Sequence, residues 1–237
     1  MSLEPLTNID PAAWFRHLDT RPTMVRVTSR AGAERAALCD LLDRLGPHAP
    51  TLCEGWTTFD LAAHLCVRDR SMLALPGYVL PAFAERTARI ERDFRAAHSY
   101  PECVRILREG APAWAPLGLP VVREAANVLE YVVHHEDVRR AQRVWQPRSV
   151  SPDLLDAVWA KLRPVARLAF ARVPVGVVLR RETGEWTRVR RRPGLVTIVG
   201  DPVELALYAY NRRDVARVEL RGDDDARAAL RAARVGL

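Results

Sequence analysis

Apolar residues in the first 140 positions recur every three or four residues, which is the spacing of one buried face of an α-helix. The first such stretch begins at Ser29 and ends at Gly46, which is followed by Pro47. Glycine and proline in this order are a typical helix end. The buried face of this predicted helix is formed by Ala37, Leu38, Leu41, Leu42 and Leu45.

A second helix is predicted to begin just after Thr57. Thr57 can cap the helix with its hydroxyl, and Asp60, three residues later, can bond back to the free backbone N–H groups. Leu61 and Leu65 mark the buried face of this helix, and His64 lies beside them. We therefore expect His64 to face inward.

Three more helices are predicted before position 147. One covers about residues 81–97, a shorter one follows Ser99, and a long one covers about residues 122–142. The proline-rich segment 111–120 separates the last two, because each proline removes a backbone donor and disfavours helix in the preceding residue. The two long helices of this group, with the first two, are expected to form a mostly antiparallel four-helix bundle.

The pattern changes after the bundle. Ser151 and Pro152 have the form of an N-cap and first helical residue, opening a helix to about Phe170. Strands are then predicted on both sides of Thr183-Gly184 and at 194–200 and 215–220, with helices starting at Asp201 and in the segment 223–235.

These elements predict an α+β protein with two domains. Residues 29–147 would form the four-helix bundle, residues 148–237 a smaller C-terminal α/β domain, and residues 1–28 an N-terminal extension. A length of 237 residues is enough for two such domains.

Composition bears on the cellular setting. The first residues lack the features of a signal peptide, and no stretch approaches the ~20 apolar residues needed to cross a bilayer. We therefore expect a soluble, cytoplasmic protein with no membrane partner. The four cysteines form no Cys-x-x-Cys pair, so we expect reduced, mostly buried thiols at Cys39, Cys53, Cys66 and Cys103.

The formal net charge of +7 raises the question of nucleic-acid binding. However, Lys161 is the only lysine, acidic residues are interleaved along the chain, and the densest basic segment, 188–194, lies beside a predicted hairpin. This distribution is typical of an arginine-rich composition rather than of a phosphate-binding surface. Nucleic-acid binding is the least favoured of three functions.

One helical segment carries candidate metal ligands. Glu130 and His134 are four residues apart, so they project from the same helix face and can bind one ion. His64, on the inner face of another helix, can supply a third ligand, and these are donor types that zinc accepts. The alternatives are a solvated Glu–His pair and a core histidine; burial near apolar neighbours favours the metal site.

Two motifs resemble a known family. The segment "TLCEGWTTFDLAAHL", residues 51–65, is similar to the first signature of the mycothiol-dependent maleylpyruvate isomerase family, and "EYVVHHEDVRRA", residues 130–141, resembles its second metal motif. This family is a branch of the DinB-like metal-binding bundles found mainly in actinobacteria. The resemblance covers residues 29–237, including the small domain after the bundle.

The resemblance implies a zinc-type divalent site at His64, Glu130 and His134. His135 occupies a position that the family does not use as a ligand and is kept as an alternative. Asp137, three residues after His134, could accept a hydrogen bond from the other ring nitrogen; its alternative role is a solvent-facing charge. The resemblance also implies a role for an arginine at the end of a C-terminal helix, which corresponds to Arg212 here; its alternative is a surface arginine in an arginine-rich protein.

The resulting hypothesis is a metal-dependent transferase or isomerase that uses mycothiol or another low-molecular-weight thiol and an electrophilic substrate. The thiol would come from outside the chain, because no cysteine supplies a ligand in the metal motifs. Arg212 would hold a substrate carboxylate, although the preceding Asn211 replaces the usual glycine of the family. The alternative function is a metal-containing binding or regulatory protein without turnover.

Overall fold

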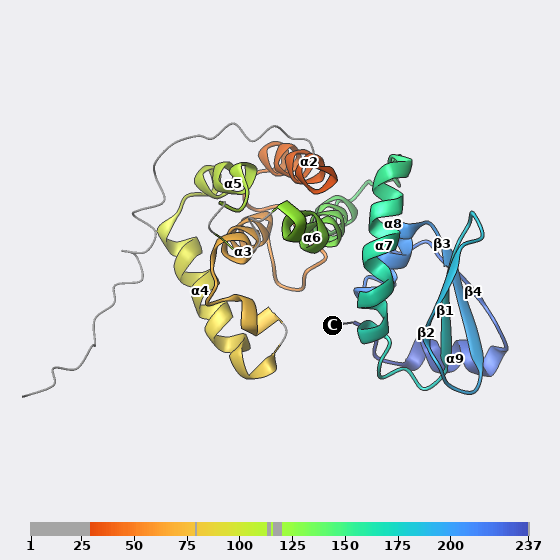
Figure 1. Cartoon of the computed structure of the whole chain (residues 1–237). Helices are drawn as coiled ribbons and strands as arrows, with labels where there is room; N and C mark the ends of the chain where they lie inside the picture. Colours follow the sequence, from red (N-terminus) through yellow and green to blue (C-terminus); the bar gives the residue numbers. More distant parts are fainter. Residues whose placement is uncertain (1–28, 79, 113–114, 116–119, 237) are drawn as a thin grey trace, which may run out of the picture.

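The computed structural model describes residues 29–78, 80–112, 115 and 120–236, with the side chains of α6 described from residue 127. The predicted extension, residues 1–28, lies outside the described residues. Figure 1 shows a helical half and a half that contains a sheet. The helical half consists of α2 (Arg30–Leu45), α3 (Thr58–Arg70), α4 (Ala84–Ala97), α5 (Tyr100–Glu109) and α6 (Pro120–Arg140), with short 3-10 helices at Leu75–Tyr78 and Pro81–Phe83.

The starts of three of these helices follow from their capping residues. The Ser29 side chain accepts a hydrogen bond from the backbone N–H of Gly32 at the start of α2. Thr57 with Asp60, and Ser99 with Glu102, form capping boxes that begin α3 and α5. Each box satisfies backbone donors that the first helical turn leaves free. The predicted helix starts at these positions are confirmed.

Four helices form the bundle: α2 packs against α5 and α6, and α3 packs against α5 and α2. Helix α4 packs on α3 from outside, as Figure 1 shows. The region predicted as one helix, 81–97, is divided into the 3-10 turn Pro81–Phe83 and α4. The bundle core contains the fully buried side chains of Leu38, Leu42, Leu61, Leu65, Leu107 and Tyr131.

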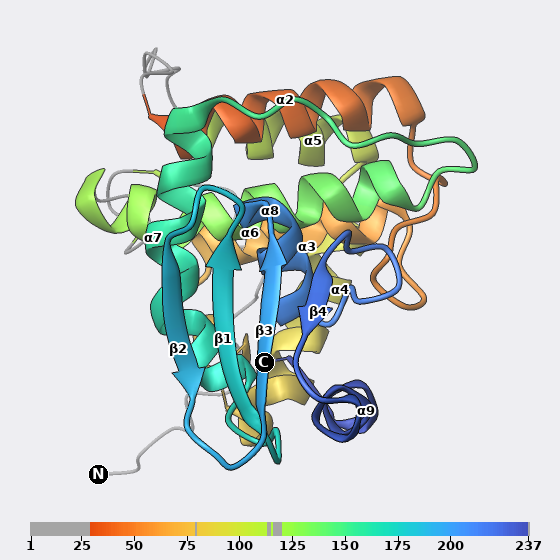
Figure 2. The same cartoon turned by 90° about the vertical axis from the view of Figure 1, so that its right-hand side faces the viewer.

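The second half is a sheet covered on one face by helices, as Figure 2 shows from its open side. Its strands have the order β2-β1-β3-β4; β1 pairs with β3 in parallel, and the other two pairs are antiparallel. Helix α7 packs on α6 and α2 as well as on α8 and β2, so it joins the two halves. The elements are α7 (Pro152–Ala169), β1 (Gly176–Arg181), β2 (Trp186–Arg190), β3 (Leu195–Gly200), α8 (Pro202–Ala209), β4 (Glu219–Arg221) and α9 (Asp224–Ala232).

The predicted α+β fold class, a four-helix bundle followed by a smaller α/β domain, is confirmed. The last strand was predicted at 215–220 but is shorter and later. The backbone N–H groups of Val215 and Ala216 both bond to the carbonyl oxygen of Arg212, so this segment turns instead of pairing with β3. Within the described residues, no helix has the length and apolar content needed to cross a membrane.

Candidate metal centre

Helices α3 and α6 bring the three predicted ligands together. The potential ligand atoms of His64, Glu130 and His134 all lie within 4.8 Å of one another. Glu130 Oε1 is 3.5 Å from His64 Nε2 and 3.2 Å from His134 Nε2. The centroids of the two imidazole rings are 5.3 Å apart. Both histidines are buried and Glu130 is partly buried, so the cluster lies inside the bundle.

Carboxylates hold the far side of both imidazole rings. His64 Nδ1 is 2.7 Å from Glu91 Oε1, and His134 Nδ1 is 3.0 Å from Asp137 Oδ2. A carboxylate that accepts the Nδ1 proton fixes the ring orientation and leaves Nε2 as the ligand atom. Both Nε2 atoms face Glu130. This set of one carboxylate and two imidazole nitrogens fits a zinc-type divalent cation.

Glu91 was not singled out from the sequence. It lies on α4, and its Oε1 atom also accepts a hydrogen bond from the Tyr78 hydroxyl at 2.8 Å. The rings of Trp56 and Tyr78 are 5.0 and 5.2 Å from the His64 ring. His64 is thus enclosed by two aromatic rings and a carboxylate, which limits its ring to one orientation.

Arg68 is a second residue that the sequence reasoning missed. Its Nε atom is 3.3 Å from Glu130 Oε1, and its Nη1 atom donates to Asn127 Oδ1 at 2.7 Å. Burial by itself raises the pKa of Glu130, but Arg68 and the two histidines outweigh it and hold that pKa well below its usual range. Glu130 is therefore a carboxylate, the form needed to bind a metal.

Asp137 is fully buried and binds His134 on the side away from Glu130. Burial favours a higher pKa for Asp137, but hydrogen bonds with His134 and Arg212 lower it to about 2. Arg212 donates from Nε and Nη2 to the two Asp137 oxygens, at 2.8 Å each. The two planar groups thus form a bidentate pair.

Cys53 lies beside this pair and was assigned no role from the sequence. Its Sγ atom is 3.3 Å from Asp137 Oδ2 and 3.9 Å from His134 Nδ1. Cys53, His134 and Asp137 form a second group of potential metal ligands. Cys53 is thus a potential ligand, whereas no cysteine was predicted to supply a ligand in the metal motifs. The other three cysteines, Cys39, Cys66 and Cys103, are buried, and all four are free thiols.

His135 and Glu136 lie on another side of α6. His135 Nδ1 is 2.7 Å from Glu34 Oε1, and Glu136 accepts hydrogen bonds from Arg140 at 2.6 Å and Arg148 at 2.7 Å. His135 is absent from the two groups of potential ligands found among the described residues.

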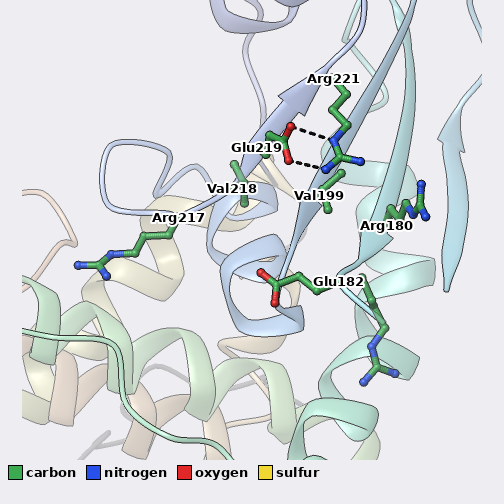
Figure 3. Close-up of a pocket in the computed structure, with 8 residues that line it drawn as sticks. Arg180, Glu182, Val199, Arg217, Val218, Glu219 and Arg221 are labelled. Atoms are coloured by element: carbon green, nitrogen blue, oxygen red, sulfur yellow. Dashed lines mark hydrogen bonds and ion pairs between the residues drawn. The ribbon is translucent and has the colours of Figure 1, made fainter. Parts of the chain in front are cut away.

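A solvent-open pocket of about 560 Å³ lies away from this cluster, on the C-terminal domain (Figure 3). It lies at the ends of β1, β3 and β4, and its lining includes Arg180, Glu182, Val199 and Arg221. Arg221 is paired with Glu219 on the same strand. Neither histidine nor cysteine lines this pocket, so it is separate from the candidate metal centre.

Similarity to known proteins is found in the structure and not in the sequence. No protein-family profile matches the chain, and no curated protein sequence matches it. Among solved structures, the crystal structure of the mycothiol-dependent maleylpyruvate isomerase is similar, with a TM-score of 0.47 and 16% identity over 80% of this chain and 88% of that chain. This degree of similarity establishes neither family membership nor function.

Proposed function

We propose that the protein binds one divalent cation, with zinc as the expected metal, through His64, Glu130 and His134. The proposal further assigns it the activity of a transferase or isomerase that uses mycothiol or a similar low-molecular-weight thiol. The metal part is supported by one observation above all: both Nε2 atoms face one carboxylate oxygen while both Nδ1 atoms are held by other carboxylates. The thiol part is supported by the resemblance of the two sequence motifs.

The residues around the cluster suit this role. A bound divalent metal lowers the pKa of a coordinated thiol or water and so supplies a nucleophile at neutral pH. Glu91 and Asp137 orient the two histidines, and Arg68 keeps Glu130 ionised. The rings of Trp56 and Tyr78 pack against the His64 ring.

The source of the thiol can be tested by removing the chain's own cysteines. Cys66 is fully buried and directs its Sγ atom to the carbonyl oxygen of Cys103, so it is not available for chemistry. Cys53 is partly exposed and close to His134. If the thiol comes from outside, metal binding and thiol-dependent turnover persist in both Cys66→Ala and Cys53→Ala.

The metal proposal is tested by elemental analysis of the purified protein beside His64→Ala, Glu130→Ala and His134→Ala. We expect one metal ion per chain in the parent and a loss of metal in each variant. His135→Ala is the matched control, because it removes the adjacent imidazole from another side of α6. A parent without metal, or equal loss in the control, would contradict the proposal.

A metal-containing binding protein without turnover is the second candidate. It is favoured by the crowding of Glu130 Oε1, which is contacted by His64, His134 and Arg68. Incubation of the metal-loaded protein with mycothiol and a panel of electrophiles separates the two functions. Thiol-dependent product formation that disappears in His64→Ala would exclude a binding function without turnover.

A further inference from the structure

Arg212 connects the C-terminal domain to the candidate metal centre. It follows α8, whereas Asp137 and His134 belong to α6 of the bundle. Both oxygens of Asp137 accept hydrogen bonds from the Arg212 guanidinium, and Asp137 Oδ2 also contacts His134 Nδ1. Arg212 of the second domain is thus linked to the proposed metal ligand His134 through Asp137.

The guanidinium has little capacity left for a substrate. Arg212 Nε and Nη2 are used on Asp137, Nη2 also contacts Cys53 Sγ at 3.3 Å, and Nη1 donates to the carbonyl oxygen of Tyr210 at 2.6 Å. An arginine has five N–H donors, so one remains. A substrate carboxylate would need two donors on one edge for bidentate binding, and those are occupied by Asp137.

Asp137 depends on this contact. It has no exposed surface, and among the described residues its carboxylate oxygens are hydrogen-bonded by Arg212, His134 and Cys53 alone. Without the guanidinium, a buried carboxylate would be left uncompensated, and such groups move, draw in water or take a proton. Each of these responses would release the His134 ring.

The end of α8 sets the direction of Arg212. Asn211 has a positive φ of 64°, and the backbone N–H groups of Asn211 and Arg212 bond to the carbonyl oxygens of Tyr208 and Leu207. This pair of bonds is a Schellman motif, which ends a helix with a fixed reversal of the chain. Asn211 thus adopts the left-handed conformation, which Asn tolerates at a helix end, and it places Arg212 on the bundle side.

We propose that Arg212 is a positioning residue, which holds Asp137 so that the His134 ring keeps Nε2 directed toward Glu130. The inference rests on the proposed metal function, and it differs from the predicted role of Arg212 as a carboxylate-binding residue. It makes the affinity of the metal centre dependent on how the C-terminal domain packs on the bundle.

The main test is metal affinity in Arg212→Gln, measured by competition with a chromophoric zinc chelator. Loss of a group that supports a metal ligand typically lowers affinity 10- to 100-fold, and we expect a loss in this range. The Co²⁺-loaded variant should also show a changed d–d absorption spectrum. Arg212→Lys, which keeps the charge but not the planar fork, should recover part of the affinity. Affinity and spectrum equal to those of the parent would overturn the inference.

Arg213→Gln is the matched control. Arg213 is the next residue and bonds to the backbone carbonyl groups of Leu230, Arg231 and Ala233 in the same domain, without contact to Asp137. We expect its metal affinity to equal that of the parent. An equal loss in both variants would show a general effect of domain stability and would overturn the positioning role.

A crystal structure of metal-free Arg212→Gln separates this inference from the metal proposal. We expect the His134 ring to turn away from Asp137 in the variant while the parent retains the contact. An unchanged ring in the variant would overturn the inference, whether or not the parent binds metal. A parent that binds no metal contradicts the proposed function alone.

Discussion

Two sides of α6 carry similar residue types but differ in charge balance. On one side, three carboxylates meet an equal number of guanidinium groups; the residues are Glu34, Glu136, Glu204, Arg139, Arg140 and Arg148. On the other side, the carboxylates that contact His64 or His134 are Glu91, Glu130 and Asp137, and they are paired with only two arginines, Arg68 and Arg212.

The difference separates a structural ion network from a candidate binding site. The balanced side satisfies its buried charges internally and has no need of a ligand. On the histidine side, the arginines are one fewer than the carboxylates that contact the histidines. Burial alone lowers the pKa of His134, but hydrogen bonds with Asp137, Cys53 and Glu130 outweigh it and raise that pKa well above its usual range. The two Nε2 atoms face the same carboxylate oxygen. A divalent cation would take the place of the His134 proton and compensate the carboxylates of this side.

The largest expected effect is the removal of Arg140 from the balanced side. Its guanidinium bonds to Glu136 and Glu204 and is almost fully buried. Arg140→Met would leave Glu204 without its guanidinium partner, while Glu136 would keep Arg139 and Arg148. Removal of one partner of a buried ion pair typically costs about 3–5 kcal/mol. Chemical denaturation should show a decrease of this size in the free energy of unfolding.

An exposed arginine provides the control for that loss. Arg108 pairs with Asp40 and Asp43 at 2.7 Å each, but its side chain is 40% exposed. Solvent-exposed pairs contribute about 0–1 kcal/mol, so Arg108→Met should be close to the parent. Equal losses in the two variants would contradict the distinction between buried and exposed networks.

The next effect concerns the histidine side and the free energy of metal binding. Zinc at about 100 times its dissociation constant should stabilise the parent by about 2.7 kcal/mol, because it binds only the folded state. His134→Ala should lose this increment, whereas His135→Ala should retain it. Thermal unfolding with and without zinc measures the increment in each protein. An increment that survives in His134→Ala would place the metal elsewhere.

A smaller effect is expected at Glu91, which supports His64. Glu91→Gln keeps the size and one acceptor oxygen but removes the charge that is 2.7 Å from His64 Nδ1. We expect zinc affinity to fall about tenfold, the lower end of the range for such supporting residues. Chelator competition measures this change. An unchanged affinity would show that hydrogen bonding alone orients His64.

The smallest effect is a change in the pH dependence of stability through Glu34 on the balanced side. Burial alone raises the pKa of Glu34, but hydrogen bonds with His135 and Arg148 outweigh it, so the folded-state pKa is lowered. The contribution of Glu34 is therefore present above the unfolded pKa near 4.5 and lost as pH falls through the lower folded value. Denaturation at a series of acidic pH values should give a shallower slope for Glu34→Gln than for the parent.

Local features of the fold could be predicted because short segments determine them. The capping box at Thr57 and the cap at Ser99 depend on residues within a few positions. Glu130 and His134 project from the same face of α6 because they are four residues apart, which is also a local property of the sequence. The bounds of the last strand were predicted less accurately, because backbone hydrogen bonds to the carbonyl oxygen of Arg212 compete with strand pairing.

Partners from distant segments could not be predicted. Glu91 reaches His64 only because α4 packs on α3, and no local pattern distinguishes it from other charged residues of α4. Cys53 lies within the first motif, but its contact with Asp137 depends on how its loop packs against α6. The Leu52 N–H donates to the Asp137 carbonyl oxygen and holds the loop there. The ligand roles of His64, Glu130 and His134 remain predictions.

The connection between the two halves has a mechanical consequence. Arg148, in the segment between α6 and α7, bonds to Glu136 on α6 and to Glu34 on α2. These bonds tie the segment to the bundle, and the Arg140–Glu204 and Arg212–Asp137 pairs join the bundle to the C-terminal half, so bending here would separate two largely buried ion pairs. The halves are therefore expected to move as one body, and access to the histidine cluster must come from side-chain or loop motion rather than from domain opening.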